Sequence, residues 1–190
     1  MDDTRRAPIE GRVILGLDPG TASTGYGVIE QRGNRLSALT YGVIGTPAGM
    51  ELHHRLEMIY HEVEVVLQRY VPQATAVESL FFNVNVRTAL AVGQARGVAI
   101  LACSLAGCAL YEYTPQQVKQ SVVGYGKAEK AQVQEMVRII LGLPEIPKPD
   151  HAADALGVAI CHAHGEAMRG GITRAIAAAE GRRSGRGSSR

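Results

Sequence analysis

Four acidic residues in this chain lie where apolar segments end or a helix begins, and this placement limits the folds it can adopt. Asp18 ends one apolar run, Glu78 ends another, and Asp150 and Asp154 open a segment with helical periodicity. A buried carboxylate is unfavourable unless it binds a cation or a hydrogen-bond donor. Strand ends and helix starts are where α/β folds gather ligand-binding groups. We therefore expect an α/β protein that holds metal between carboxylates.

The apolar periodicity predicts three consecutive strands followed by alternating helices and strands. The clearest helix covers residues 52–70, where apolar side chains recur at intervals of three and four until Pro72. The expected strands are residues 13–17, 25–30, 36–44, 74–77 and 109–113. The other expected helices are residues 87–106, a helix starting at Pro115, residues 127–141 and residues 150–164. This order favours a mixed five-stranded sheet flanked by helices on both faces.

Length and composition are those of one domain with a substantial core, since 46% of the 190 residues are hydrophobic. We expect residues 12–168 to form this domain, after a flexible tip at 1–11. Residues 169–190 contain six arginines and one glutamate, which predicts a disordered basic tail. Such a tail suits polyanion binding and suits a purely solubilising role equally well. No membrane span or signal peptide is expected, and three cysteines without metal-ligand spacing favour a reducing cytoplasm.

The acidic positions can be placed on these elements. Asp18 and Glu78 are expected to emerge at one edge of the sheet if their strands are neighbours. His151 and Asp154 share a helix face because they are three residues apart, and the alanines around them let that helix approach the sheet. Asp150 follows a proline and is expected to cap the helix. The alternative roles are turn capping for Asp18 and Glu78 and a solvated first-turn position for His151.

Seven motifs follow one another along the chain. They are Leu15-Gly-Leu-Asp18-Pro-Gly, Thr24-Gly-Tyr-Gly27, Val77-Glu78-Ser-Leu-Phe81-Phe82-Asn83, Gly93-Gln-Ala-Arg96-Gly97, Gln117-Val-Lys119-Gln, Val123-Gly-Tyr-Gly126 and His151-Ala-Ala-Asp154-Ala-Leu. Together they resemble the RuvC family of Holliday-junction resolvases over about residues 12–165. The resemblance implies a ribonuclease-H-like fold, a homodimer, and magnesium-dependent endodeoxyribonuclease activity on four-way DNA junctions in recombination and repair.

By this resemblance, Asp18, Glu78, His151 and Asp154 match the catalytic acidic quartet and are the expected metal ligands. Many relatives have an aspartate where this chain has His151, and Asp150 lies beside it, so either residue is a candidate to face the metal. Two Mg²⁺ ions per site, about 3.5–4 Å apart, would clamp the scissile phosphate, with Asp18 as the candidate bridge. An imidazole at position 151 would also suit Mn²⁺, or would orient or deprotonate the attacking water.

Other residues are expected to hold the DNA. Phe81 and Phe82 follow the catalytic Glu78 closely, and we expect Phe81 to be exposed and to stack on an unpaired base while Phe82 packs inward. The alternative is that both phenylalanines fill the core. Two of the expected phosphate contacts, Lys119 and Lys130, match basic positions of the family. The full set of phosphate-contact candidates is Arg87, Arg96, Lys119, Lys127 and Lys130.

The expected partners are four-way junction DNA, a second copy of the chain, and a branch-migration helicase complex of the RuvA and RuvB type. A two-fold dimer supplies two identical sites for two matched nicks. Val92, Ala95, Ala99 and Cys103 form a small-residue stripe on the helix over residues 87–106, which is a candidate dimer face. The same stripe is equally able to pack on the sheet.

Three other functions remain open from the sequence. The segment from Asp18 to Gly25 also resembles the first phosphate loop of actin-like ATPases, but those proteins need two lobes and would leave Glu78 unexplained. A non-catalytic junction-binding module predicts a basic groove without an acidic cluster. A related ribonuclease-H-like nuclease acting on other branched DNA or on RNA differs from the main hypothesis only in its substrate.

Overall fold

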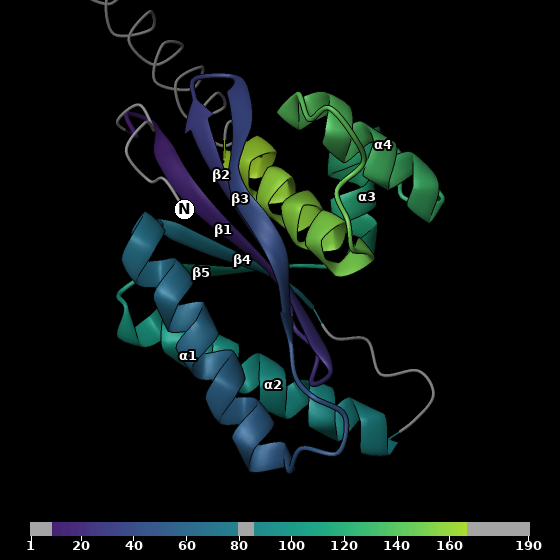
Figure 1. Cartoon of the computed structure of the whole chain (residues 1–190). Helices are drawn as coiled ribbons and strands as arrows, with labels where there is room; N and C mark the ends of the chain where they lie inside the picture. The colour runs from purple at the N-terminus through teal and green to yellow at the C-terminus, as the bar shows by residue number, and fades with distance from the viewer. Residues whose placement is uncertain (1–8, 80–85, 167–190) are drawn as a thin grey trace, which may run out of the picture.

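The computed structural model describes residues 9–79 and 86–166, which form one mixed sheet covered on both faces by helices (Figure 1). The strand order is β3-β2-β1-β4-β5. Strand β1 pairs antiparallel with β2, β2 pairs antiparallel with β3, and β1, β4 and β5 run parallel. The strands are β1 Arg12–Asp18, β2 Ser23–Arg32, β3 Arg35–Gly45, β4 Ala74–Glu78 and β5 Ala109–Tyr113. The predicted five-stranded mixed sheet is confirmed.

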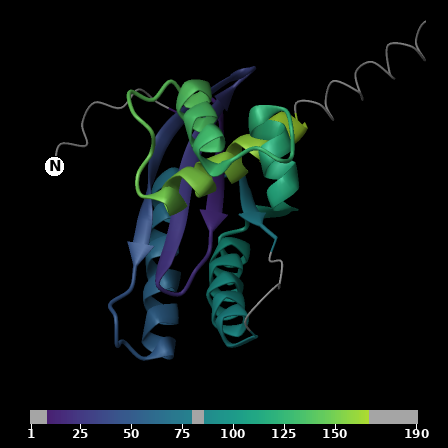
Figure 2. The same cartoon turned by 90° about the vertical axis from the view of Figure 1, so that its right-hand side faces the viewer.

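The helices form two layers, one on each face of the sheet (Figure 2). Helices α1 (Leu52–Tyr70) and α2 (Val86–Leu105) lie side by side on one face. The other face carries α3 (Pro115–Val123), α4 (Lys130–Leu141) and a last helix over residues 150–166. Each layer encloses its own apolar cluster, because alternate β1 residues point to opposite faces. None of the helices in the described part of the chain is long and apolar enough to cross a membrane.

Capping hydrogen bonds set the starts of α3 and α4. Thr114 and Gln117 cap α3 reciprocally, with hydrogen bonds of 2.8 and 3.1 Å between each backbone N–H and the other side chain. Helix α4 begins at Lys130, three residues later than predicted from the apolar pattern. The reason is that the Gln132 side chain accepts a hydrogen bond of 2.9 Å from the Glu129 N–H and so fixes the helix start there.

Glycines on β1 and β2 let the last helix lie directly on the sheet. A Cβ atom at Gly16 would lie 2.0 Å from the Ala155 carbonyl oxygen, and one at Gly25 would lie 2.0 Å from the carbonyl oxygen of His151. A Cβ atom at Gly27, which pairs with Gly16, would lie 2.7 Å from the Leu156 side chain and 3.0 Å from the Leu156 backbone nitrogen. Only glycine allows backbone to approach this closely. The glycines therefore bring the start of the last helix to the end of β1.

The small-residue stripe of α2 faces inward. Ala95, Ala99 and Cys103 are fully buried in the apolar cluster between α1, α2 and the sheet. The stripe is thus not a dimer face, and the alternative that it packs on the sheet is correct. A charge introduced at Ala95 is accordingly expected to cause aggregation, because it would be buried without a partner.

Candidate active site

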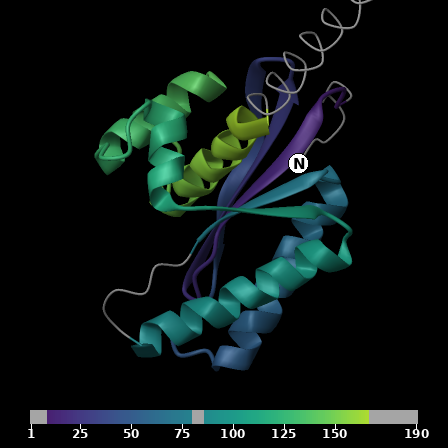
Figure 3. The ribbon, with the colours of Figure 1, turned by 180° about the vertical axis from the view of Figure 1, so that it is seen from behind.

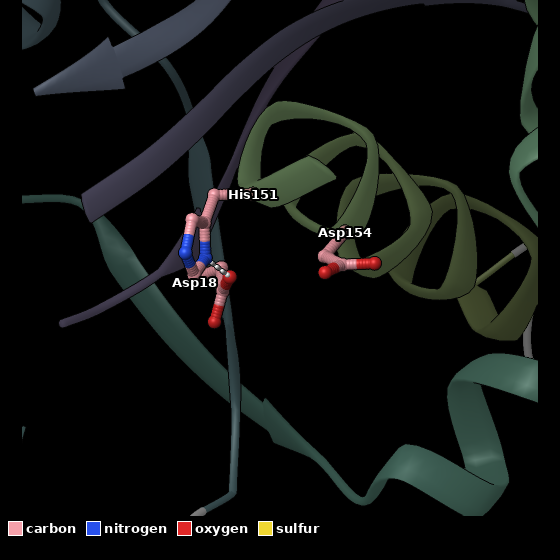
Figure 4. A group of neighbouring side chains, drawn as sticks. All are labelled: Asp18, His151 and Asp154. Atoms are coloured by element: carbon pink, nitrogen blue, oxygen red, sulfur yellow. Dashed lines mark hydrogen bonds and ion pairs between the residues drawn. The ribbon is translucent and has the colours of Figure 1, made fainter. Parts of the chain in front are cut away.

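Three possible metal ligands meet where β1 ends against the last helix (Figure 4). Asp18 is the final residue of β1, and His151 and Asp154 share one face of the helix, as predicted. The His151 Nδ1 atom lies 2.7 Å from Asp18 Oδ2. One ligand atom from each of the three residues lies within 4.8 Å of the others. The side chains of Asp18 and Asp154 are 19% and 31% exposed, so the group is open to a substrate from one side.

Glu78 lies beside this group because β4 runs parallel to β1. Leu17 pairs with Val77, so Asp18 and Glu78 are the next residues along neighbouring strands. Burial, together with the negative charges of Asp18 and Asp154, raises the pKa of Glu78 from an ordinary value of 4.5 to about 7. Lys119 and Lys130 oppose this shift only in part. The predicted convergence of Asp18, Glu78, His151 and Asp154 is therefore found in the structure.

Glu78→Gln is expected to stabilise the metal-free protein at alkaline pH. Between about pH 4.5 and pH 7 the unfolded chain loses the Glu78 proton while the folded chain keeps it, so wild-type stability falls as the pH rises through this range. Glutamine removes that loss, which we put at about 1–2 kcal/mol after allowing for solvent screening. Urea unfolding in chelator at pH 8 and at pH 4.5 measures this loss of stability. Compared with the wild type, Glu78→Gln should be more stable only at pH 8.

The control for this prediction is Glu57→Gln, since Glu57 is exposed on α1 and pairs only with another exposed side chain, His54. Glu57→Gln should leave the difference in unfolding free energy between pH 8 and pH 4.5 unchanged. A Glu78→Gln variant less stable than the wild type at pH 8 would contradict the unfavourable burial of this carboxylate.

The Asp150 side chain is not part of the three-residue group and bonds to α4. Its carboxylate lies 3.0 Å from Lys130 Nζ and accepts a 3.0 Å hydrogen bond from Gln134 Nε2. The prediction that its side chain caps the last helix is wrong, because residue 150 already belongs to the helix and its carboxylate bonds to these two side chains of α4. His151, rather than Asp150, lies against Asp18.

A pocket of about 230 Å³ adjoins the acidic group. Its lining combines carboxylates, two lysines and an apolar floor, and consists of Glu78, Pro115, Val118, Lys119, Lys130, Val133, Asp154 and Val158. Lys130 Nζ also lies 3.1 Å from Asp154 Oδ2. Cations beside carboxylates are what a site needs to hold a phosphate against bound metal. Lys119 and Lys130 are thus the two predicted phosphate contacts that the structure brings to the site.

The remaining predicted DNA contacts lie elsewhere or outside the described residues. Arg96 is on α2, where it pairs with Glu112 at 2.8 Å on the opposite face of the sheet from the last helix. Lys127 is exposed in the turn before α4. Phe81, Phe82 and the Arg87 side chain lie outside the part that the structure describes, so their predicted roles stay predictions.

The donor set fits a divalent cation. Carboxylate oxygens are the ligands that Mg²⁺ prefers, and one imidazole beside them also suits Mn²⁺. Burial raises the pKa of Asp154, although Lys130 opposes the shift, and the pKa of Glu78 is raised as well. Carboxyl groups that resist ionisation together would be stabilised as anions by a cation between them. The arrangement is therefore able to hold metal and to present it to a phosphate.

Known proteins resemble this chain in both sequence and structure. The family model described as "Crossover junction endodeoxyribonuclease RuvC" matches residues 14–162. The protein of that name from Heliobacterium modesticaldum is 62% identical over 152 residues, which cover 80% of this chain and 94% of that protein.

A solved structure described as T. thermophilus RuvC in complex with Holliday junction substrate superposes with a TM-score of 0.79 at 40% identity, over 83% of this chain and 96% of that one. The yeast mitochondrial Holliday junction resolvase Ydc2 has a TM-score of 0.58 at 14% identity, covering 84% of this chain and 80% of that one, which is a likeness of fold alone. The predicted ribonuclease-H-like fold is confirmed by these neighbours.

Proposed function

This chain belongs to the RuvC family of crossover junction endodeoxyribonucleases, and we propose that it resolves four-way DNA junctions by paired, magnesium-dependent phosphodiester hydrolysis in recombination and repair. The observation that carries the proposal is the meeting of Asp18, His151 and Asp154 beside Glu78 at the end of β1. An actin-like ATPase would leave this group unexplained. A non-catalytic junction-binding module would not need buried carboxylates with raised pKa values.

Each side chain has a role in this proposal. Two bound Mg²⁺ ions would activate the attacking water and stabilise the leaving oxygen, and Mn²⁺ would be a substitute. Asp18 contacts His151 and ends the strand beside that of Glu78, so it is proposed to be the shared ligand, with Glu78 and Asp154 as the other carboxylate ligands. His151, 2.7 Å from Asp18, completes the ligand set or orients the water. Lys119 and Lys130 would hold the phosphate from the adjoining pocket.

The proposal is tested with a synthetic four-way junction, a linear duplex and an RNA–DNA hybrid, each with and without Mg²⁺. We expect symmetric nicks in the junction alone, and only with metal. If the protein instead cleaves the hybrid or another branched DNA in preference to the junction, it is a related ribonuclease-H-like nuclease with a different substrate. Metal-independent cleavage would contradict the role of the acidic group.

We propose further that the protein is a homodimer that uses the outward face of α2, which lies in front of α1 in Figure 3. Leu90, Leu101 and Leu105 are 65%, 52% and 68% exposed at helical spacing along this face. Gly93 and Gly97 lie in the same helix, and a Cβ at either would meet nothing within 4 Å of the chain itself. Glycine in a helix costs about 1 kcal/mol, and its smallness here would let a second helix approach. An exposed apolar face with this pattern suits a two-fold interface.

Leu101→Glu is expected to convert the dimer to folded monomers, because it places a charge in the apolar face. The two nicks of a junction should then become uncoupled. Sedimentation at micromolar concentration measures the first effect, and the matched control is Ile139→Glu on α4, since Ile139 is 54% exposed on the other side of the sheet. A Leu101→Glu dimer, or a wild-type monomer that makes paired nicks, would contradict the proposed interface.

The resemblance to the family also supports a branch-migration helicase complex of the RuvA and RuvB type as a partner, and a cytoplasmic location. The free thiols of Cys103, Cys108 and Cys161 suit a reducing compartment. Cys103 and Cys161 are buried, and Cys108 is half-buried. Co-purification with a helicase that acts on the same junctions tests the first part.

A further inference from the structure

One lysine is shared between a proposed metal ligand and a carboxylate outside the metal group. Lys130 Nζ lies 3.1 Å from Asp154 Oδ2 and 3.0 Å from Asp150 Oδ2. The Asp154 side chain is 31% exposed and belongs to the group of three possible ligands, whereas Asp150 is 64% exposed and does not belong to it. The ammonium group therefore shares the Asp154 carboxylate with any cation that this residue would hold.

We infer that Asp150 is a positioning residue. It holds the Lys130 ammonium group when Asp154 binds a cation instead of Lys130. This inference rests on the proposed function, because it assigns Asp154 to the metal. A lysine ammonium and a divalent cation on one carboxylate repel each other, so binding of the cation must weaken the bond between Lys130 and Asp154. Without a second partner, the Lys130 ammonium group would either compete with the metal for Asp154 or leave the site on its flexible side chain.

Asp150 is held ready for this role by α4 itself. Gln134 Nε2 donates a 3.0 Å hydrogen bond to Asp150 Oδ1, while Oδ2 is the atom nearest Lys130. Gln134 and Lys130 are four residues apart and so share one face of α4. The lysine, the glutamine and Asp150 thus form a unit that does not depend on Asp154. The unit keeps the ammonium at the pocket beside Glu78, where Lys119 also lies.

The test is a double-mutant cycle read by Mn²⁺ binding to the full-length protein without DNA, using the electron paramagnetic resonance signal of free Mn²⁺. The proteins are the wild type, Asp150→Asn, Lys130→Met and the double variant. We expect Asp150→Asn to weaken Mn²⁺ binding roughly threefold to fivefold, the upper part of the range of an exposed ion pair, because Lys130 then competes for Asp154. With Lys130→Met already present, Asp150→Asn should change Mn²⁺ binding by less than about twofold.

The cycle separates this role from the other roles that Asp150 could have. If Asp150→Asn weakens binding equally with and without Lys130, Asp150 acts on the cation directly, as a ligand or through its charge, and the inference is overturned. No weakening in either background, or no Mn²⁺ binding by the wild type, also overturns it. Glu145→Gln, which removes one exposed negative charge elsewhere, should leave binding unchanged. A wild type that binds Mn²⁺ but cleaves no junction would refute the proposed function and leave this inference standing.

Discussion

Asp18→Asn is expected to abolish junction cleavage while leaving junction binding intact or tighter. The substitution keeps the shape of the side chain but removes one formal charge from the group formed with His151 and Asp154. Metal affinity should fall, and repulsion of the DNA phosphate should fall as well. Because metal supplies several kcal/mol of transition-state stabilisation, the loss in cleavage rate should be on the order of 10³-fold or more.

Single-turnover cleavage in Mg²⁺ and a binding assay in chelator measure these two effects separately. The control is Glu57→Gln, which removes one exposed charge from α1, on the face of the sheet opposite the last helix. This variant should cleave at the wild-type rate. Cleavage by Asp18→Asn at a near-normal rate would overturn the assignment of Asp18. Loss of junction binding together with cleavage would instead point to a structural role for this carboxylate.

Gly25→Ala is expected to remove activity by displacing the last helix rather than by altering any ligand. The added Cβ would lie 2.0 Å from the His151 carbonyl oxygen and 2.5 Å from the carbonyl carbon, so backbone must move. Overpacking of this kind costs about 1–3 kcal/mol or more. Because Gly25 pairs directly with Asp18, the displacement would separate His151 from Asp18. Cleavage should fall together with the melting temperature.

Gly45→Ala provides the matched control, since Gly45 ends β3 and a Cβ there would meet nothing within 4 Å. It should melt and cleave like the wild type. A Gly25→Ala protein with unchanged melting temperature and full activity would show that the last helix has room to move away from the sheet without harm.

The periodicity of the sequence was sufficient to predict the strands and most helix limits, because apolar spacing reports directly which face of an element is buried. It also placed Asp18 and Glu78 at the ends of strands and His151 and Asp154 on one helix face, whereas their assignment as one quartet came from the family resemblance. The start of α4 was misplaced because Gln132 fixes it with a hydrogen bond that leaves the apolar pattern unchanged. Local contacts of this kind carry little sequence signal.

One question that the sequence left open and one wrong prediction had a common physical cause, namely that spacing along a helix does not say what lies opposite. The stripe with Ala95 and Ala99 faces the core, and the exposed face of α2 carries Leu101 and Leu105 instead. Asp150 has the sequence position of a cap but bonds to α4, which no local pattern indicates. The contact of the last helix with β1 and β2 was detectable in principle, because glycines inside strands often mark a close backbone approach.

The hydrogen bond between Asp18 and His151 joins residues 133 positions apart in the chain. The first strand of the sheet is therefore made well before the helix that carries His151. A chain that ends before the last helix lacks His151 and Asp154 altogether. Such a fragment cannot assemble the group of Asp18, His151 and Asp154, so the proposed active site would be complete only once the last helix has packed on the sheet.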